Sequence, residues 1–290
     1  MGGGGGPGWG RRVLPGWGRR VLPAKLVKPV GLLIGAWALA LGVAAASGVP
    51  TGTLRTVALL VVSPLWFLLP YLALSAATGP LIRLVDRTGP AIALAGVATV
   101  ALTDLGLLPG WLAIPAAWSV PWVLGVALAR GRLGGAGTGL RLALGGAAGL
   151  AYLMNVLHYP ASAVGVPGDG RSNLDPPSLF AIALAAVQIG VFLMVRERVR
   201  RFCERPAIAG LNRAALPIYL SHQSVLVVVA GAVALVAPKA PGLLTAPGHP
   251  SWALQRLAWL PVLAAILAVL VRFRLARKGG DRHAERADAH

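Results

Sequence analysis

Apolar runs about as long as a bilayer is thick recur along this chain of 290 residues. An α-helix rises about 1.5 Å per residue, so about 20 residues cross about 30 Å of hydrocarbon. None of the runs alternates apolar with polar residues, as the strands of a membrane barrel would. The sequence therefore predicts an all-α, polytopic integral membrane helical bundle of about eight helices. The expected spans are Pro29–Gly48, Thr56–Ala77, Pro90–Leu108, Trp111–Ala129, Gly139–Leu157, Pro177–Val195, Asn212–Pro238 and Trp252–Val271.

The composition favours a membrane protein over a nucleic-acid-binding protein. With 56% hydrophobic and 12% charged residues, the chain has more apolar surface than a soluble core buries. A net charge of +18 would suggest a nucleic-acid partner for a soluble protein, so the position of the charges decides. If the chain starts in the cytoplasm, all 27 basic residues lie on the inner side except Arg55, Arg171, Lys239 and Arg256. The positive-inside rule then places both termini in the cytoplasm.

Three segments differ in composition. Residues 1–28 are basic and rich in Gly, Trp and Arg, and Gly-Trp-Gly-Arg-Arg-Val-Leu-Pro occurs twice in succession within 8–23. This segment lacks the apolar core and cleavage site of a signal peptide, so a cytoplasmic linker lying on anionic headgroups is expected. Residues 29–271 form the expected transmembrane domain, and residues 272–290 form a basic cytoplasmic tail.

Residue usage also indicates the cellular setting. Arginine far outnumbers lysine, and Ala, Gly, Leu and Pro dominate, which suggests the GC-rich genome of a bacterium and hence a bacterial plasma membrane. The single cysteine, Cys203, lies in an expected cytoplasmic loop, so no intrachain disulfide forms.

The best polar candidate within a span is His222. It lies about 11 residues from the cytoplasmic start of its helix, which is roughly 16 Å deep at about 1.5 Å per residue. The surrounding residues 219–224 are also largely polar, and Gln188 reaches a similar depth on the preceding helix. The two side chains are expected to share an interhelical hydrogen bond. Either they form a purely structural polar clasp, or His222 lines a substrate or acyl path.

A polar outer loop is expected at His158–Ser178. Its residues Asp169, Arg171 and Asn173 could bind a hydrophilic acceptor, although an ordinary connecting loop would look the same. His158 is a second candidate for a catalytic base. It has no second His or Cys nearby, so the spacing does not predict a metal site.

Arginines form the densest basic stretch after the sixth expected span. The four that could hold phosphates are Arg196, Arg198, Arg200 and Arg201. They either serve membrane topology alone or form a phosphate-binding mouth for an acyl-CoA or a lipid headgroup. The sequence contains no glycine-rich phosphate loop, no Gly-x-Ser-x-Gly elbow and no metal motif.

Three patches, taken in chain order, resemble the acyltransferase 3 family of bacterial membrane-bound acyltransferases over roughly residues 11–235. They are Pro-Leu-Trp-Phe-Leu at 64–68 with Tyr71 after it; Tyr159-Pro160, Val-Gly-Val-Pro-Gly at 164–168 and Ser172-Asn173 before Pro176-Pro177; and Leu-Pro-Ile-Tyr-Leu-Ser-His at 216–222.

The resemblance implies a function that moves an acyl group from cytoplasmic acyl-CoA to an extracytoplasmic carbohydrate or lipid-linked acceptor. It implies acyl-CoA as co-substrate with no bound cofactor, and membrane lipids and a glycan or lipid-linked acceptor as partners, without nucleic acid. By this resemblance, His222 would line the acyl path and Gln188 would contact substrate. The four arginines at 196, 198, 200 and 201 would hold the CoA phosphates.

Members of the family typically have ten helices, and the opening ones carry a conserved arginine and a catalytic histidine that have no counterpart here. We therefore expect a fragment, a start placed too far downstream, or a degenerate member. A non-catalytic membrane subunit and a small-molecule transporter are the rival interpretations. A transporter would favour intramembrane charges or paired broken helices in two matching halves.

Overall fold

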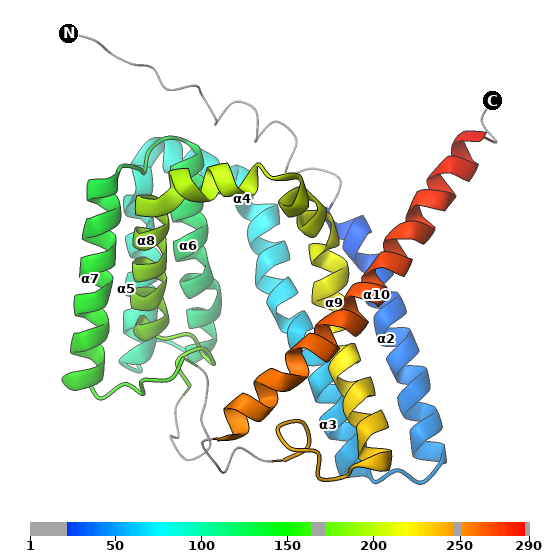
Figure 1. Cartoon of the computed structure of the whole chain (residues 1–290). Coiled ribbons are helices and arrows are strands. Elements are labelled where there is room, and N and C mark those ends of the chain that lie inside the picture. Colours follow the sequence, from blue (N-terminus) through cyan, green and yellow to red (C-terminus); the bar gives the residue numbers. More distant parts are fainter. Residues whose placement is uncertain (1–21, 164–171, 246–250, 288–290) are drawn as a thin grey trace. The chain divides into compact units, whose positions relative to one another are not determined.

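This computed structural model describes residues 22–163, 172–245 and 251–287, and those residues contain helices but no β-strand. The α-helices are α2 (Leu22–Ala46), α3 (Thr51–Val62), α4 (Leu68–Thr88), α5 (Ala93–Asp104), α6 (Ala113–Ala129), α7 (Ala136–Asn155), α8 (Leu179–Cys203), α9 (Pro206–Val236) and α10 (Ser251–Ala287) (Figure 1). Short 3₁₀ helices join some of them: η1 (Ser63–Phe67), η2 (Gly89–Ile92) and η3 (Gly110–Leu112). The all-α class is confirmed.

Six helical stretches of the described residues are long and apolar enough to cross a membrane, not the eight expected. The expected span Thr56–Ala77 and most of the expected span Pro90–Leu108 fall within one helical stretch, Thr51–Asp104, because η1 and η2 join α3, α4 and α5 without an extended break. The expected span Gly139–Leu157 does form a helix, α7, but its glycines and Arg141 lower its mean hydropathy, and it is not among the six. The predicted number of membrane-spanning helices was therefore wrong, and the predicted all-α membrane architecture was right.

The helices divide into two compact units. The first is built on Leu69–Phe202 and holds α5, α6, α7 and most of α4 and α8. The second combines Lys25–Leu68 with Cys203–His290 and holds α3, α9, α10 and most of α2. The segment boundaries expected from composition, at residues 28 and 271, stay a prediction.

In the first unit, α5 and α6 pack closely through small residues. Gly96 of α5 lies so near α6 that a Cβ atom on it would come within 2.8 Å of the carbonyl oxygen of Ala116. Small residues let helix backbones approach, and this packing matters in lipid, which supplies no hydrophobic force between helices. Val85 of α4 is fully buried in the same core, with Val120 and Ala127 of α6. The core therefore holds the end of α4, which carries Asp86, against α6.

Glycines also set the packing of α7 on α8. A Cβ atom on Gly139 would lie 2.8 Å from the carbonyl oxygen of Gly190, and one on Gly146 would lie 2.7 Å from the carbonyl oxygen of Ala183. All three glycines are buried. The two helix backbones therefore touch without side chains between them.

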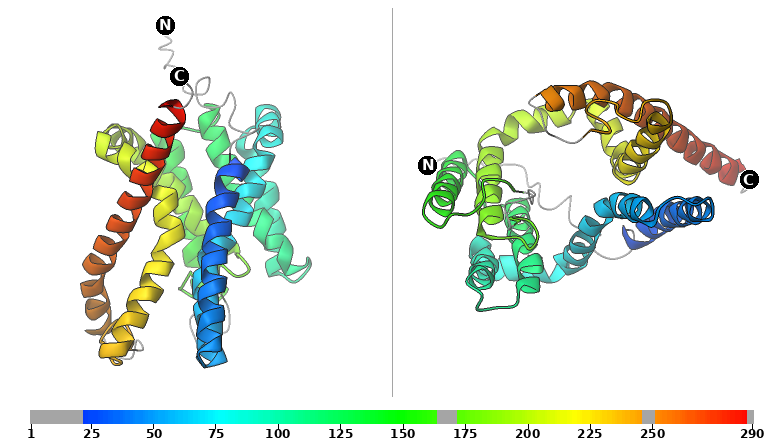
Figure 2. Two further views of the ribbon diagram at one scale, coloured as in Figure 1. Left: turned by 90° about the vertical axis from the view of Figure 1, so that its right-hand side faces the viewer. Right: turned by 90° about the horizontal axis from the view of Figure 1, so that it is seen from below.

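In the second unit, α9 contacts several other helices. α10 packs against it and crosses it at an angle (Figure 1 and Figure 2), and α3 and η1 contact it as well. From α2, the indole nitrogen of Trp37 donates a hydrogen bond to the hydroxyl of Ser224, at 2.9 Å. Residues of α2 and η1 therefore lie beside the middle of α9, where His222 is found.

The loop between α9 and α10 is held by one face of α10. Arg256 donates to the carbonyl oxygen of Gly242 at 3.0 Å and lies 5.9 Å from the ring centre of Trp252. The indole nitrogens of Trp252 and Trp259 donate to two further carbonyls of the same loop. Arg256 was an exception to the expected inward placement of basic residues, and its carbonyl contacts give it a local structural role.

Many large apolar side chains remain exposed on the helices. The exposed fraction is 87% for Leu235, 84% for Val236 and 75% for Leu69. A soluble protein rarely exposes apolar surface on this scale, whereas hydrocarbon tails solvate it. The exposed apolar surface therefore agrees with a protein that lies in a membrane.

Candidate functional site

His222 lies near the middle of α9, and its ring is oriented by its own helix. Its Nδ1 is 2.7 Å from the backbone carbonyl oxygen of Tyr219. A carbonyl oxygen can only accept a hydrogen bond, so Nδ1 carries the proton of the neutral ring and Nε2 keeps a free lone pair. The side chain is exposed. In that neutral ring, the lone pair on Nε2 of His222 is the one available to a general base.

Aromatic and polar groups of the second unit lie beside His222. The ring centre of Tyr219 is 6.1 Å from that of His222 and 6.5 Å from that of Phe67 in η1. One position before His222, Ser221 is only 1% exposed, and its hydroxyl has no hydrogen-bond partner among the described residues. A buried hydroxyl without a partner costs roughly 1–3 kcal/mol. A polar group of a bound substrate could offset that cost.

Asn173 organises the loop between α7 and α8. Its side chain is fully buried, and its Nδ2 donates to the carbonyl oxygens of Pro160, at 2.7 Å, and Ser162, at 2.9 Å. Its Oδ1 accepts from the hydroxyl of Ser178 at 2.9 Å. The amide is thus occupied within the loop. The expectation that Asn173 binds substrate stays a prediction.

Asp104, the last residue of α5, ties the same loop to two helices. One carboxylate oxygen accepts from the hydroxyl of Tyr159 at 2.8 Å and from the backbone N–H of Leu179 at 2.9 Å. Hydrogen bonds to an ionised carboxylate are stronger than neutral ones. Asp104 therefore joins the end of α5, the loop and the start of α8.

His158 stands beside these anchors. It is exposed, and its φ of 55° lies in the left-handed region that residues other than glycine rarely adopt. Such a conformation costs of order 1–3 kcal/mol and persists where the surrounding structure enforces it. The anchored Tyr159 and Pro160 directly follow His158, so the loop presents this imidazole from a defined backbone.

The four arginines expected to bind phosphate lie in the last turns of α8, and all are exposed. Arg200 pairs with Glu197 on the same helix, with 3.1 Å between its Nε and a carboxylate oxygen. Successive helical residues are rotated by about 100°, so Arg196 and Arg198 point about 200° apart. The run therefore does not form one cluster on one face.

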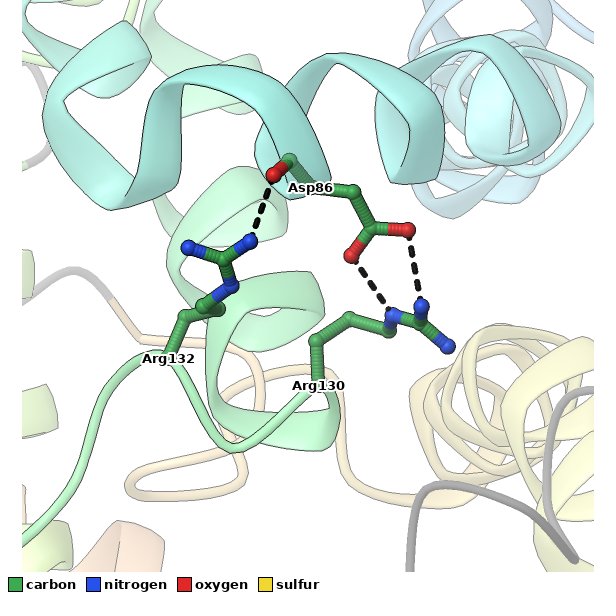
Figure 3. A network of polar contacts seen from close by, with 3 residues as sticks. All are labelled: Asp86, Arg130 and Arg132. Atoms are coloured by element: carbon green, nitrogen blue, oxygen red, sulfur yellow. Dashed lines mark hydrogen bonds and ion pairs between the residues drawn. The ribbon is translucent and has the colours of Figure 1, made fainter.

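A second basic group lies at the junction of α4 with the α6–α7 loop (Figure 3). Arg130 forms a two-pronged ion pair with Asp86, with distances of 2.8 Å and 2.7 Å between nitrogen and oxygen. Arg132 donates to the backbone carbonyl oxygen of Asp86 at 2.5 Å. The hydrogen bond and negative charge of Asp86 raise the pKa of Arg130 above its usual value. The loop is therefore fixed to α4 through Asp86.

Arg196 of α8 reaches the same loop. A Cβ atom on Gly134 would lie 3.4 Å from a terminal nitrogen of the Arg196 guanidinium. Glycines on either side, Gly131 and Gly135, have φ values of +70° and +86°, which glycine adopts at little cost. The loop thus brings Arg196 close to the segment that carries Arg130 and Arg132.

The structure distributes the predicted site residues over both units. His222 lies in the second unit, and His158, Asn173, Gln188 and the four α8 arginines lie in the first. Gln188 is exposed, and its predicted contact with His222 stays a prediction. Asp169 and Arg171 lie outside the described residues. Sequence reasoning did not find the loop-anchoring role of Asp104 or the Asp86 group, whose partners lie far away in sequence.

Within the described residues, no group of three or more His, Cys, Asp and Glu side chains is placed to hold a metal ion.

Comparison with known proteins identifies the family. The model of the acyltransferase 3 family, described as an acyltransferase domain, matches residues 14–273. Searches of curated proteins and of solved structures found no match. The matched region contains every helix from α2 to α9, together with His222, the loop between α7 and α8 and both basic groups. The chain belongs to the acyltransferase 3 family of membrane acyltransferases.

Proposed function

We propose that this chain transfers an acyl group from acyl-CoA to a hydroxyl group of a carbohydrate or lipid-linked acceptor. The observation that carries this proposal, within the family, is the contact of 2.7 Å between Nδ1 of His222 and the carbonyl oxygen of Tyr219. This contact leaves Nε2 able to take a proton from the acceptor hydroxyl.

The reaction requires the acceptor oxygen to attack the thioester carbonyl of acyl-CoA. As the new C–O bond forms, the base removes the hydroxyl proton. The C–S bond then breaks, CoA leaves as a thiolate, and the proton returns to its sulfur. His222 is the proposed base, and Tyr219 positions its ring through the carbonyl contact.

His158 is the second candidate for the base. It is exposed on the anchored outer loop, where a hydrophilic acceptor would arrive. In this proposal Asp169, Arg171 and Asn173 of the same loop bind the acceptor, and Gln188 contributes to substrate binding. The arginines at the end of α8 hold the phosphates of CoA, because guanidinium groups match phosphate oxygens in two-pronged hydrogen bonds.

Acyl transfer by the purified chain tests the proposal. The chain is reconstituted in phospholipid vesicles with ¹⁴C-acetyl-CoA and a panel of monosaccharides, glycolipids and lipid-linked oligosaccharides. We expect label in a carbohydrate-containing product, matched by release of an equal amount of free CoA thiol. Acyl-CoA binding without thiol release and without label in any acceptor would instead favour a non-catalytic membrane subunit.

The proposed orientation places both termini in the cytoplasm of a bacterium and His158–Ser178 outside the plasma membrane. It is supported by the uneven distribution of the 27 basic residues. Cys203 is a free, exposed thiol at the end of α8 and provides a direct test. We expect an impermeant maleimide to label Cys203 only after the cells are permeabilised.

A matched control uses the opposite side. In a Cys203→Ser background, Ala161→Cys places a thiol at an exposed position of the outer loop. This thiol should be labelled in intact cells. Labelling of Cys203 in intact cells, or protection of the residue 161 thiol there, would reverse the orientation.

A further inference from the structure

We propose that Phe67 of η1 is a positioning residue for the imidazole of His222, and that it acts through the ring of Tyr219. The proposal deepens the proposed function and rests on it for His222 as the base. It gives the Pro-Leu-Trp-Phe-Leu patch at 64–68 a role in the reaction.

Three aromatic side chains lead to His222 through a series of ring contacts within the second unit. The ring centre of Trp66 is 6.3 Å from that of Phe67, with the two planes at 85°. The ring centre of Phe67 is 6.5 Å from that of Tyr219, with the planes at 61°, and Tyr219 is 6.1 Å from His222, with the planes at 41°. Aromatic rings attract one another at centre distances of about 4.5–7 Å, commonly edge to face. Each step of the series lies within that range.

The 3₁₀ turn of η1 explains how Phe67 reaches α9. α3 ends at Val62, and Pro64, near the start of η1, lacks the N–H that would continue the α-helical hydrogen bonds. A 3₁₀ helix has about 3 residues per turn, so the side chains of Trp66 and Phe67 point about 120° apart. η1 contacts α9. The turn thus directs Phe67 to Tyr219, while Trp66 meets Phe67 edge to face.

Tyr219 transmits the contact to His222 in two ways. The residues are three apart on α9, so their side chains are neighbours on the helix surface. The backbone carbonyl of Tyr219 accepts the hydrogen bond from Nδ1, and the tyrosine ring lies beside the imidazole. The hydrogen bond alone lets the imidazole tilt about the N–H···O axis. The tyrosine ring limits that tilt while its own rotamer is held, and Phe67 is a contact from outside α9 that holds it.

The orientation of the imidazole matters because a base must point at the proton that it removes. A reacting group displaced by about 1 Å can lose about 10²-fold in rate. Phe67 acts on the direction of Nε2, and the loss of its ring should therefore lower kcat. Acyl-CoA binding should change little, since orientation of the base is needed in the transition state.

The first arm of the test measures kcat and the KM for acyl-CoA in phospholipid vesicles. Phe67→Leu keeps an apolar side chain without the ring, and kcat should fall by about 3- to 10-fold with KM changed by less than about 2-fold. Phe67→Tyr keeps the ring and should restore most of the rate. Phe192→Leu on α8 is the matched control, because Phe192 is 44% exposed and Phe67 is 36% exposed. This control should retain the rate.

A double variant separates positioning from a general loss of folded protein. In His222→Ala the imidazole is absent, so adding Phe67→Leu should lower the remaining rate by less than about 2-fold. A side chain that only stabilises the fold would lower the rate by the same factor in both backgrounds. Equal factors would overturn the proposal.

The second arm observes the imidazole itself and does not depend on catalysis. The full chain is labelled with ¹⁵N-histidine in nanodiscs, and the signals of His222 are identified by their loss in His222→Ala. Nitrogen chemical shifts distinguish a protonated ring nitrogen from an unprotonated one. The unchanged chain and Phe67→Tyr should show one neutral form with the proton on Nδ1, whereas Phe67→Leu should show a mixture of the two neutral forms. Identical His222 signals in Phe67→Leu and the unchanged chain would overturn the proposal.

The two arms together distinguish this proposal from the proposed function. Altered His222 signals in Phe67→Leu, with transfer that is insensitive to His222→Ala, would contradict His222 as the base and retain the orienting contact. Transfer that requires His222 but is unchanged in Phe67→Leu would retain the base and contradict the positioning role of Phe67.

Discussion

Replacing His222 by alanine is expected to lower the rate of acyl transfer by about 10²–10⁴-fold, which is what a positioned general base contributes. The ring is held by the 2.7 Å contact between Nδ1 and the carbonyl oxygen of Tyr219, so Nε2 is the proton acceptor. The rate is measured as thiol release and label transfer from ¹⁴C-acetyl-CoA in vesicles. Binding of CoA should change little, because the base acts in the transition state.

Two further measurements distinguish a base from a structural clasp. Added imidazole should partly restore transfer by His222→Ala, because it can supply the missing base in the space left by the ring. Val228→Ala, an exposed position on the same helix, provides the control and should retain transfer. A clasp would show the opposite pattern: lower thermal stability, no rescue by imidazole, and transfer in proportion to folded protein.

The comparison with His158→Ala decides between the two candidate bases. If transfer survives in His222→Ala but falls by about 10²-fold or more in His158→Ala, the proton is removed at the outer loop. That result would contradict the role proposed for His222. It would also give a catalytic reason for the left-handed backbone of His158, whose φ is 55°.

The helical architecture was predictable because apolar length and composition report directly on the solvent of a helix. The number of membrane-spanning helices was not predictable in the same way. Ser63–Phe67 interrupts α-helix with a 3₁₀ turn, yet the residues around it are as apolar as any span. A hydropathy pattern therefore cannot show where α3 ends and α4 begins. The proline in this turn was visible, but prolines also occur inside α9 and α10.

The site was predictable only where it depended on single residues. His222 stood out because a histidine in an apolar helix is rare, whereas the nitrogen that carries its proton depends on its side-chain rotamer. Asp104 was not predicted as a loop anchor, because its partners are 55 and 75 residues away in the chain. Asp86 and Arg130 are 44 residues apart. Such pairs arise from helix packing, which one sequence does not reveal.

The arginine run at the end of α8 shows that residues close in sequence need not lie together in the structure. Arg196, Arg198, Arg200 and Arg201 were grouped because they are close in sequence. On α8 they spread around the helix axis, and only the contact of Arg196 with the loop at Gly134 distinguishes one of them. Sequence proximity predicted a basic end of the helix but could not predict which of these guanidinium groups reaches the α6–α7 loop.

A single methyl group on Gly190 is expected to destabilise the first unit by about 3 kcal/mol, at the upper end of the usual cost of overpacking. A Cβ atom there would collide with the backbone nitrogen of Ala143 and lie 2.5 Å from the carbonyl oxygen of Gly139. Both are main-chain atoms of α7, so no side chain can rotate away. Gly190→Ala should therefore force α7 and α8 apart and lower the temperature of thermal unfolding in detergent by several degrees.

Gly145→Ala is the matched control, because the same substitution on α7 meets no atom within 4 Å. Alanine is favoured over glycine in a helix interior by about 1 kcal/mol, so this variant should be as stable as the unchanged chain or slightly more stable. The two substitutions are chemically identical and differ only in what the new methyl group meets. Equal unfolding temperatures for Gly190→Ala and Gly145→Ala would show that α7 and α8 do not touch at this point. The close packing of α7 on α8 inferred from Gly139, Gly146 and Gly190 would then be wrong.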